Sequence, residues 1–284
     1  MRITRDKIYH QFKAEIAPKA VISPGERITV ETLDAAGGRF LEDFVYFRPN
    51  PATGPIYVEG AAPGDALEIE IHGINLIGKG FLNVPDGENR LEIKFESLPG
   101  GDLRVLKNGK TFKAQPMIGV VGVAARPDLP GDHFTVETGD YGGNMDNNAV
   151  VAGIRLYLPV FVPGALLGIG DIHGIMGDGE VFGQGVEICA DVDISVNVKK
   201  DMKINRPLVI SDDIISTAAS AETMERASEL AVADMRFILE THYGMTPADA
   251  ALAIAFYGNL RVCHIVNPQK TMRAEIKKEI LSLF

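Results

Sequence analysis

Hydrophobic and polar residues alternate with a period of two along much of the first two thirds of the chain. The clearest stretches are 27–31, 66–72 and 91–96. Along 66–72, three aliphatic residues occupy one face, and two glutamates and a histidine occupy the other. Such alternation is typical of strands with one buried face. Turn sequences such as Pro63-Gly64-Asp65 and Pro85-Asp86-Gly87 separate the stretches, so this part is predicted to form a β-sandwich or barrel.

The middle of the chain has continuous apolar runs at 117–125, 154–162 and 165–169. Runs of this kind predict strands buried on both faces. A long alternating strand is predicted at 186–198, where the even positions are apolar and the odd positions, from Glu187 onward, are mostly polar.

The last part of the chain changes to helical spacing. Apolar residues recur every three or four positions along 220–242, which predicts an amphipathic helix. Thr246-Pro247 then resembles an N-cap followed by proline at the first helical position, and a short helix is predicted to Tyr257. A strand is predicted at 260–266. The fold class is therefore mainly β with a helical C-terminal unit, α+β overall, divided at 1–115, 116–205 and 206–284.

Composition narrows the possible partners. The chain has 284 residues, a net charge of −10 and a pI of about 5.1. Nucleic acid is an unsuitable partner because binding phosphates requires a basic stripe, whereas an acidic cleft that binds cations is compatible with this charge.

No run is long and apolar enough for a membrane span, and no signal peptide is evident. The two cysteines, Cys189 and Cys263, are far apart, so we expect a reducing, cytoplasmic compartment.

Candidate chemistry begins at the end of the predicted strand near residue 170. Asp171 and His173 are two positions apart, so both side chains are expected on the same strand face. Glu187 opens the next long strand and is placed to join them. Mixed nitrogen and oxygen ligands suit Zn²⁺ or a similar divalent ion. The alternative, which local spacing alone slightly favours, is a His–Asp hydrogen bond at a strand end with Glu187 on a solvated face.

Two glycine-rich segments flank this motif. Gly177-Asp178-Gly179-Glu180 places two carboxylates in a tight loop, where one could accept a proton from water. Its alternative is an Asp-Gly hairpin turn between the flanking strands. Gly142-Gly143-Asn144-Met145-Asp146 resembles a loop whose Asn144 amide and backbone N–H groups stabilise an oxyanion, and its alternative is a capped glycine turn.

Other polar residues favour structural roles. His72 is expected on an exposed strand face, and His133 in a loop that could lie near the site. Cys189 is expected to be a buried, inert thiol. The sequence has no nucleophile elbow, no P-loop and no dinucleotide fingerprint, which disfavours a serine hydrolase and a nucleotide enzyme.

Together these segments resemble the acetamidase/formamidase family. The central block, 142–146 with 158–167 and 170–180, carries the likeness, and 53–65 and 259–263 extend it. The resemblance implies a β-sandwich joined to a small barrel-like part and an α/β C-terminal unit. It also implies hydrolysis of short aliphatic amides to a carboxylate and ammonia, by a homodimer or larger homo-oligomer. Two positions depart from the family pattern, Tyr141 in place of histidine and Asn259 in place of aspartate.

The leading hypothesis is an amidohydrolase that uses a divalent ion, with zinc as the first expectation and calcium as the alternative. Asp171, His173 and Glu187 are expected to bind the ion. Glu180 is expected to be the general base, supported by Asp178. Asn144 and nearby backbone N–H groups are expected to bind the oxyanion. Asp146 and Tyr141 are expected to lie behind the catalytic and metal-binding residues and to support them. A non-catalytic β-sandwich that binds a cation or small ligand is the alternative, and a hydrolase of longer or cyclic amides is the third possibility.

Overall fold

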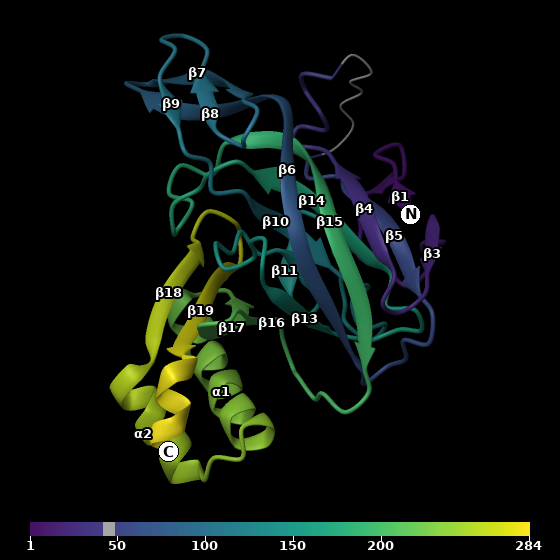
Figure 1. The fold of residues 1–284 in the computed structure, drawn as a ribbon, viewed down its shortest axis with the longest axis vertical. Coiled ribbons are helices and arrows are strands. Elements are labelled where there is room, and N and C mark those ends of the chain that lie inside the picture. Colours follow the sequence, from purple (N-terminus) through teal and green to yellow (C-terminus); the bar gives the residue numbers. More distant parts are fainter. Residues whose placement is uncertain (42–48) are drawn as a thin grey trace.

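Two long antiparallel strands form the spine of the molecule. They are β6 (Ala66–Asp86) and β15 (Glu187–Lys199), which pair over most of the length of β15. The computed structural model describes residues 1–41 and 49–284. The other edge of β15 pairs with β4 (Arg27–Thr32), which pairs in parallel with β1 (Arg2–Ile3), and the strands curl around a common core (Figure 1).

A second group of strands packs against this spine. β14 (Leu167–His173) lies between β10 (Met117–Gly122) and β5 (Ala52–Val58), and its last residue pairs with the first residue of β15. Short strands extend this group: β2 (Ile8–Tyr9), β3 (Ala20–Ile22), β11 (Thr138–Gly139) and β12 (Gly142–Asn144). The aliphatic side chains between the two groups form the main core.

The end of β6 leads into a hairpin that projects from the spine (Figure 1). It comprises β7 (Asn89–Ser97), β8 (Leu103–Val105) and β9 (Thr111–Phe112). The turn predicted at Pro85-Asp86-Gly87 is confirmed, since Asp86 pairs with Asn89 across it.

The C-terminal unit is a smaller sheet covered by helices. β13 (Arg155–Pro159) and β16 (Leu208–Ile210) link the spine to β17 (Ile214–Ala221), β19 (Lys270–Lys277) and β18 (Asn259–His264). α1 (Met224–His242) and α2 (Pro247–Tyr257) pack with it around a second core, and a 3-10 helix follows at Lys278–Leu283. Thr223 and Thr246 cap the two helices by accepting from the N–H groups of Arg226 and Asp249.

The fold class predicted from the sequence is confirmed, as are both helices. The bounds differ in two places. β6 was expected to end near His72 but continues to Asp86, because β15 and β7 pair with it beyond the regular alternation. The first residues of the stretch predicted as a helix at 220–242 belong to β17, and the helix begins after the Thr223 cap. The three domain boundaries stay predictions, although β6 pairs with strands beyond residue 115.

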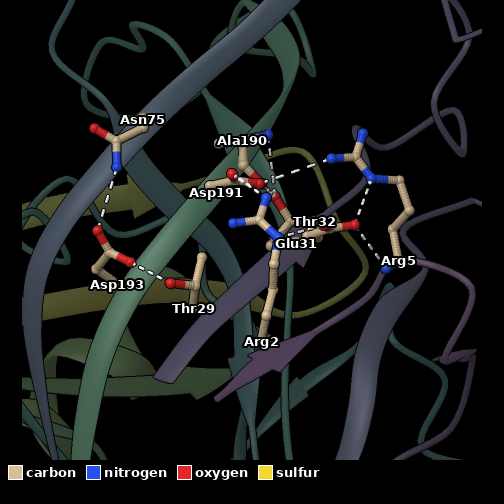
Figure 2. A network of polar contacts seen from close by, with 9 residues as sticks. All are labelled: Arg2, Arg5, Thr29, Glu31, Thr32, Asn75, Ala190, Asp191 and Asp193. Carbon is tan, nitrogen blue, oxygen red and sulfur yellow. Dashed lines mark hydrogen bonds and ion pairs between the residues drawn. The ribbon is translucent and has the colours of Figure 1, made fainter. Parts of the chain in front are cut away.

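The two faces of β15 have the expected chemistry over most of its length. The even positions from Ala190 to Val196 are buried in the main core, and Asp191 and Asp193 are partly exposed on the other face. Figure 2 shows this outer face, where Asp191 binds Arg2 and Arg5, and Thr29 donates to Asp193 at 2.6 Å. At the start of the strand, however, Glu187 is only 1% exposed. The solvated alternative for Glu187 is therefore wrong.

No helix in the described part of the chain has the length and apolar character needed to cross a membrane.

Candidate metal and catalytic centre

The centre is built where β14 and β15 meet. His173 and Glu187 are directly opposed on these strands, and His173 Nε2 lies 3.1 Å from Glu187 Oε1. The same nitrogen lies 3.5 Å from Asp171 Oδ1. The structure thus brings together the three residues that the sequence predicted as metal ligands, and Asp171 and His173 do face the same side.

Asp146 and Glu180 complete the cluster. Asp146 Oδ1 lies 3.9 Å from His173 Nδ1, so this carboxylate lies within reach of the same imidazole. Its predicted role, supporting the ligands from behind, stays a prediction. Glu180 is 6% exposed. Among the described residues, two sets of three have ligand atoms close enough to share one ion: Asp146 with Asp171 and His173, and His173 with Glu180 and Glu187.

Three of the acids have an unusual backbone. The φ angles of Asp146, Asp171 and Glu180 are 43°, 53° and 46°, in the left-handed region that non-glycine residues seldom adopt. Each such residue costs on the order of 1–3 kcal/mol and persists only where the surrounding structure enforces it. The shared conformation therefore points to a function for these three carboxylates rather than to stability.

Two glycines make room for the cluster. A Cβ atom on Gly119 would lie 2.7 Å from Asp146 Oδ1 and 2.8 Å from the Asp171 carbonyl oxygen. A Cβ on Gly185 would lie 2.6 Å from the His173 ring. Neither glycine was identified from the sequence, because nothing in the local pattern separates them from ordinary strand and turn glycines.

The cluster contains more acidic groups than basic ones. Desolvation and neighbouring carboxylates raise the pKa of Glu180 to about 7 and that of Glu187 to about 8. Burial together with Glu180 raises the pKa of Asp146 well above its usual value. Burial alone would lower the pKa of His173, but Glu187 and Asp171 reverse this effect and raise it. A buried group of acids with one imidazole needs further positive charge, either protons or a cation.

The residues present fit a divalent cation. Both carboxylate oxygens of Asp146 and Oδ1 of Asp171 are buried without a hydrogen-bond partner in the described structure. Outer contacts hold the remaining oxygens: Asn50 Nδ2 donates to Asp171 Oδ2 at 2.8 Å, and the Ala35 N–H donates to Glu187 Oε2 at 3.3 Å. One imidazole with several carboxylates is a donor set that suits zinc, whereas calcium prefers oxygen ligands alone.

A cavity of about 290 Å³ opens beside the cluster. Its lining includes Asp171, Glu180 and Glu187 together with Asn144, which is 5% exposed. Asn144 Oδ1 has no partner among the described residues. The backbone N–H groups of residues 144–146 donate to the carbonyl oxygens of Glu137 and Gly119, so the predicted oxyanion contacts would have to come from other N–H groups and stay a prediction.

Asp178 lies away from the acid cluster and does not line the cavity. Arg273 donates to both of its carboxylate oxygens, at 3.1 and 3.0 Å, and Asn148 donates to it at 3.0 Å. Although partial burial opposes ionisation, the contacts with Arg273 and Asn148 lower the pKa of Asp178, so it stays ionised and is a poor proton acceptor.

The turn at 177–180 is joined to the C-terminal unit. The Gly179 N–H donates to the Cys263 carbonyl oxygen at 3.0 Å, and the Ile265 N–H donates to that of Gly179 at 3.2 Å. The hairpin alternative for this turn is wrong, because β14 ends at His173 and β15 begins at Glu187, with a long loop between them. β18 and β19 therefore hold the loop that carries Glu180.

The two departures from the family pattern lie outside the cavity lining. Tyr141 packs edge-on against His133, with ring centroids 5.6 Å apart, and burial raises its pKa. Asn259 is exposed and donates to the Tyr257 carbonyl oxygen.

The structural roles predicted for His72 and Cys189 are confirmed. His72 is exposed on β6, and Cys189 is buried, with the pKa of its thiol raised by burial to about 12.

Several cavity residues could not be predicted from the sequence, because they come from segments that are distant from the central motif along the chain. Asn50 and Arg39 come from the segments before β5, and Asn267 comes from the loop between β18 and β19. Buried Asp34 folds the first of these segments by accepting from the N–H groups of Ala36, Gly38 and Arg39. Nothing in the local sequence around them marks a site.

Comparison with known proteins identifies the family. The model of the acetamidase/formamidase family matches residues 2–137 and 132–224, well over half of the chain. The chain belongs to this family. It is similar to a formamidase of Methylophilus methylotrophus, with 26% identity over 263 residues, which cover 69% of this chain and 65% of that protein. The chain thus matches slightly less than two thirds of the length of this curated relative.

Solved structures of the family share the fold. A predicted acetamidase/formamidase from the thermophile Thermoanaerobacter tengcongensis is 34% identical, with a TM-score of 0.89, over 100% of this chain and 97% of that one. An acetamidase from Bacillus halodurans is also 34% identical with a TM-score of 0.89, over 100% of this chain and 99% of that one.

Proposed function

We propose that this member of the acetamidase/formamidase family hydrolyses short-chain aliphatic amides to a carboxylate and ammonia. The observation that carries the proposal is the buried cluster of His173 with four carboxylates, which opens into a cavity whose other walls carry carboxamide side chains. The names of the similar proteins, a formamidase and acetamidases, supply the substrate class.

Asp171, His173 and Glu187 are the residues that we assign to a divalent ion, zinc by their donor set, and Asp146 is close enough to join them. When bound, such an ion lowers the pKa of a coordinated water to about 7 and polarises a carbonyl oxygen. Ala35 and Asn50 fix the outer oxygens of Glu187 and Asp171, so the inner oxygens keep one orientation.

Glu180 is the proposed general base and then general acid. It lines the cavity, and burial raises its pKa to about 7, close to the value at which a carboxylate can both take and return a proton near neutral pH. It takes a proton from water as the oxygen bonds to the amide carbon. It then gives that proton to the nitrogen as the C–N bond breaks, so ammonia leaves and the acid product ionises. Asp178 supports this step by holding the turn against Arg273.

Asn144 is proposed to bind the substrate through its side-chain amide, which faces the cavity. A cavity of about 290 Å³ has room for a formyl, acetyl or propionyl group with several waters. This size suits the short amides and does not require a longer substrate.

The test is ammonia release from formamide, acetamide and propionamide, with metal content measured before and after chelation. Turnover that disappears with the metal and returns with zinc supports the proposal. If the metal-free protein keeps full activity, the ion has no catalytic role, and the amidase function still stands. If the protein hydrolyses none of these three amides, and no longer or cyclic amide either, the result favours a cation-binding protein without catalytic activity.

We further propose that the protein acts as a homodimer or larger homo-oligomer in a reducing, cytoplasmic compartment. Phe256 and Leu260 of the C-terminal unit are 67% and 52% exposed, and both cysteines are free. Exposed apolar side chains that gather on one unit are typical of subunit contacts. Sedimentation at micromolar concentration tests this, and a monomer at all concentrations would contradict it.

A further inference from the structure

Asn267 is a cavity residue for which the proposed chemistry has not yet assigned a role. It belongs to the loop between β18 and β19, and it lines the cavity together with Glu180 and Asn144. Its Nδ2 atom is buried and has no partner among the residues that the structure describes. A buried amide donor without a partner is destabilising, so its retention points to a ligand that accepts a hydrogen bond from it.

Asn144 presents the opposite chemistry in the same cavity. Its Oδ1 atom is a buried acceptor without a partner among the described residues, on a side chain that is 95% buried (5% exposed). A primary carboxamide needs one acceptor for its N–H groups and one donor for its carbonyl oxygen. The two unpartnered atoms supply this pair.

Several other donors at the cavity already have partners among the described residues. Asn50 Nδ2 donates to Asp171, and Arg39 pairs with Glu92 at 2.5 Å while its guanidinium lies over the Phe81 ring. The backbone N–H groups of residues 144–146 are taken up by carbonyl oxygens. The Asn267 amide is thus a buried donor at the cavity that remains available to a substrate oxygen.

The loop that carries Asn267 is held firmly at both sides. Lys270 Nζ donates to the Asn267 carbonyl oxygen at 2.5 Å, and the Thr271 hydroxyl meets His264 Nε2 at 2.8 Å. The same unit holds Glu180 through Gly179 and Arg273. The C-terminal unit therefore reaches the centre at two points, one for the base and one for the substrate.

We propose that Asn267 and Asn144 form a clamp for a primary carboxamide, resting on the amidase function proposed above. Asn144 Oδ1 accepts from the substrate N–H, and Asn267 Nδ2 donates to the carbonyl oxygen. The first contact exists already in the bound substrate and lowers KM. The second strengthens as negative charge develops on that oxygen and raises kcat.

The experiment compares Asn267→Ala, Asn267→Asp and Asn144→Ala on acetamide. Asn267→Ala should lower kcat by about 10²–10³-fold, the usual cost of removing an oxyanion donor, with metal content and melting temperature unchanged. Asn267→Asp keeps the size of the side chain but removes the donor, so it should lose as much. Asn144→Ala should act chiefly by raising KM. Gln269→Ala is the control, because Gln269 is exposed and does not line this cavity.

The outcomes separate this proposal from the one on which it rests. A wild-type protein without amidase activity contradicts the proposed function. An active wild type with unchanged kcat in Asn267→Ala overturns the clamp, as does Asn267→Asp with full activity. If Asn267→Ala fails to fold, Asn267→Asp decides the matter alone. Metal loss in either folded Asn267 variant would also overturn it, because the role would then be structural.

Discussion

Glu187 is the cross-strand partner of His173, and the two side chains meet at 3.1 Å in a fully buried position. The carboxylate comes from the first residue of β15 and the imidazole from the last residue of β14. Side chains of directly opposed residues in antiparallel strands lie close together. The pairing register thus brings two of the proposed ligands together, and a shift by one residue would turn Glu187 to the other face.

Glu187→Gln should lose bound metal because it replaces a charged ligand by a neutral amide at the centre. After dialysis, the variant is expected to retain little zinc by elemental analysis and to have little activity. Asp193→Asn is a matched control, since Asp193 lies on the same strand but on the partly exposed face shown in Figure 2. Equal metal content in the two variants would contradict the ligand assignment for Glu187.

Glu180→Gln should lower kcat on acetamide by about 10²–10⁴-fold, the range for loss of a general base. The melting temperature should stay the same or rise, because the substitution removes one of several mutually repelling buried carboxylates. Ammonia release and thermal unfolding measure the two effects. Activity within a few-fold of wild type would exclude Glu180 as the base.

Local patterns in the sequence were sufficient for the strand alternation, both helices and the motif of Asp171, His173 and Glu187. They could not supply Asn50 or Asn267, because only the tertiary fold brings those loops to the cavity. They also could not show that Asp146 lies within reach of His173, or that Asp178 differs from Glu180 in being ion-paired. The difference arises from Arg273, which lies about a hundred residues further along the chain and neutralises Asp178.

Arg273→Met should weaken the hold on the loop that carries Glu180. Arg273 is buried and donates to both carboxylate oxygens of Asp178. It also donates to Glu275 at 2.6 Å, and the substitution removes this bond as well. We expect destabilisation of about 1–3 kcal/mol and a lower kcat with little change in KM. Arg261→Met is the control, since Arg261 binds Glu275 from an exposed position. Equal kcat in both variants would show that Arg273 does not position Glu180.

Gly119→Ala should disturb the proposed metal centre without replacing any of its ligands. The added methyl group would lie within 3.0 Å of Asp146 Oδ1 and of the Asp171 backbone and side chain. Both acids must then move. Metal affinity and activity should fall by at least about tenfold, as they do when residues that orient metal ligands are mutated. Gly73→Ala is the matched control, because its Cβ would meet atoms no closer than 3.8 Å. Metal titrations of the two variants decide the question.

His264 should make the protein less stable in mild acid. Burial, followed by the charge on Lys270, lowers its pKa to about 4, below the unfolded value of about 6.5. The unfolded chain therefore binds the proton first, so the contribution of His264 is complete above pH 6.5 and is lost as the pH falls toward 4. The loss amounts to about 3 kcal/mol. Urea unfolding between pH 7 and 4.5 should show a shallower loss of stability in His264→Gln than in the wild type. Parallel curves would contradict a neutral, buried His264, whatever the difference in absolute stability.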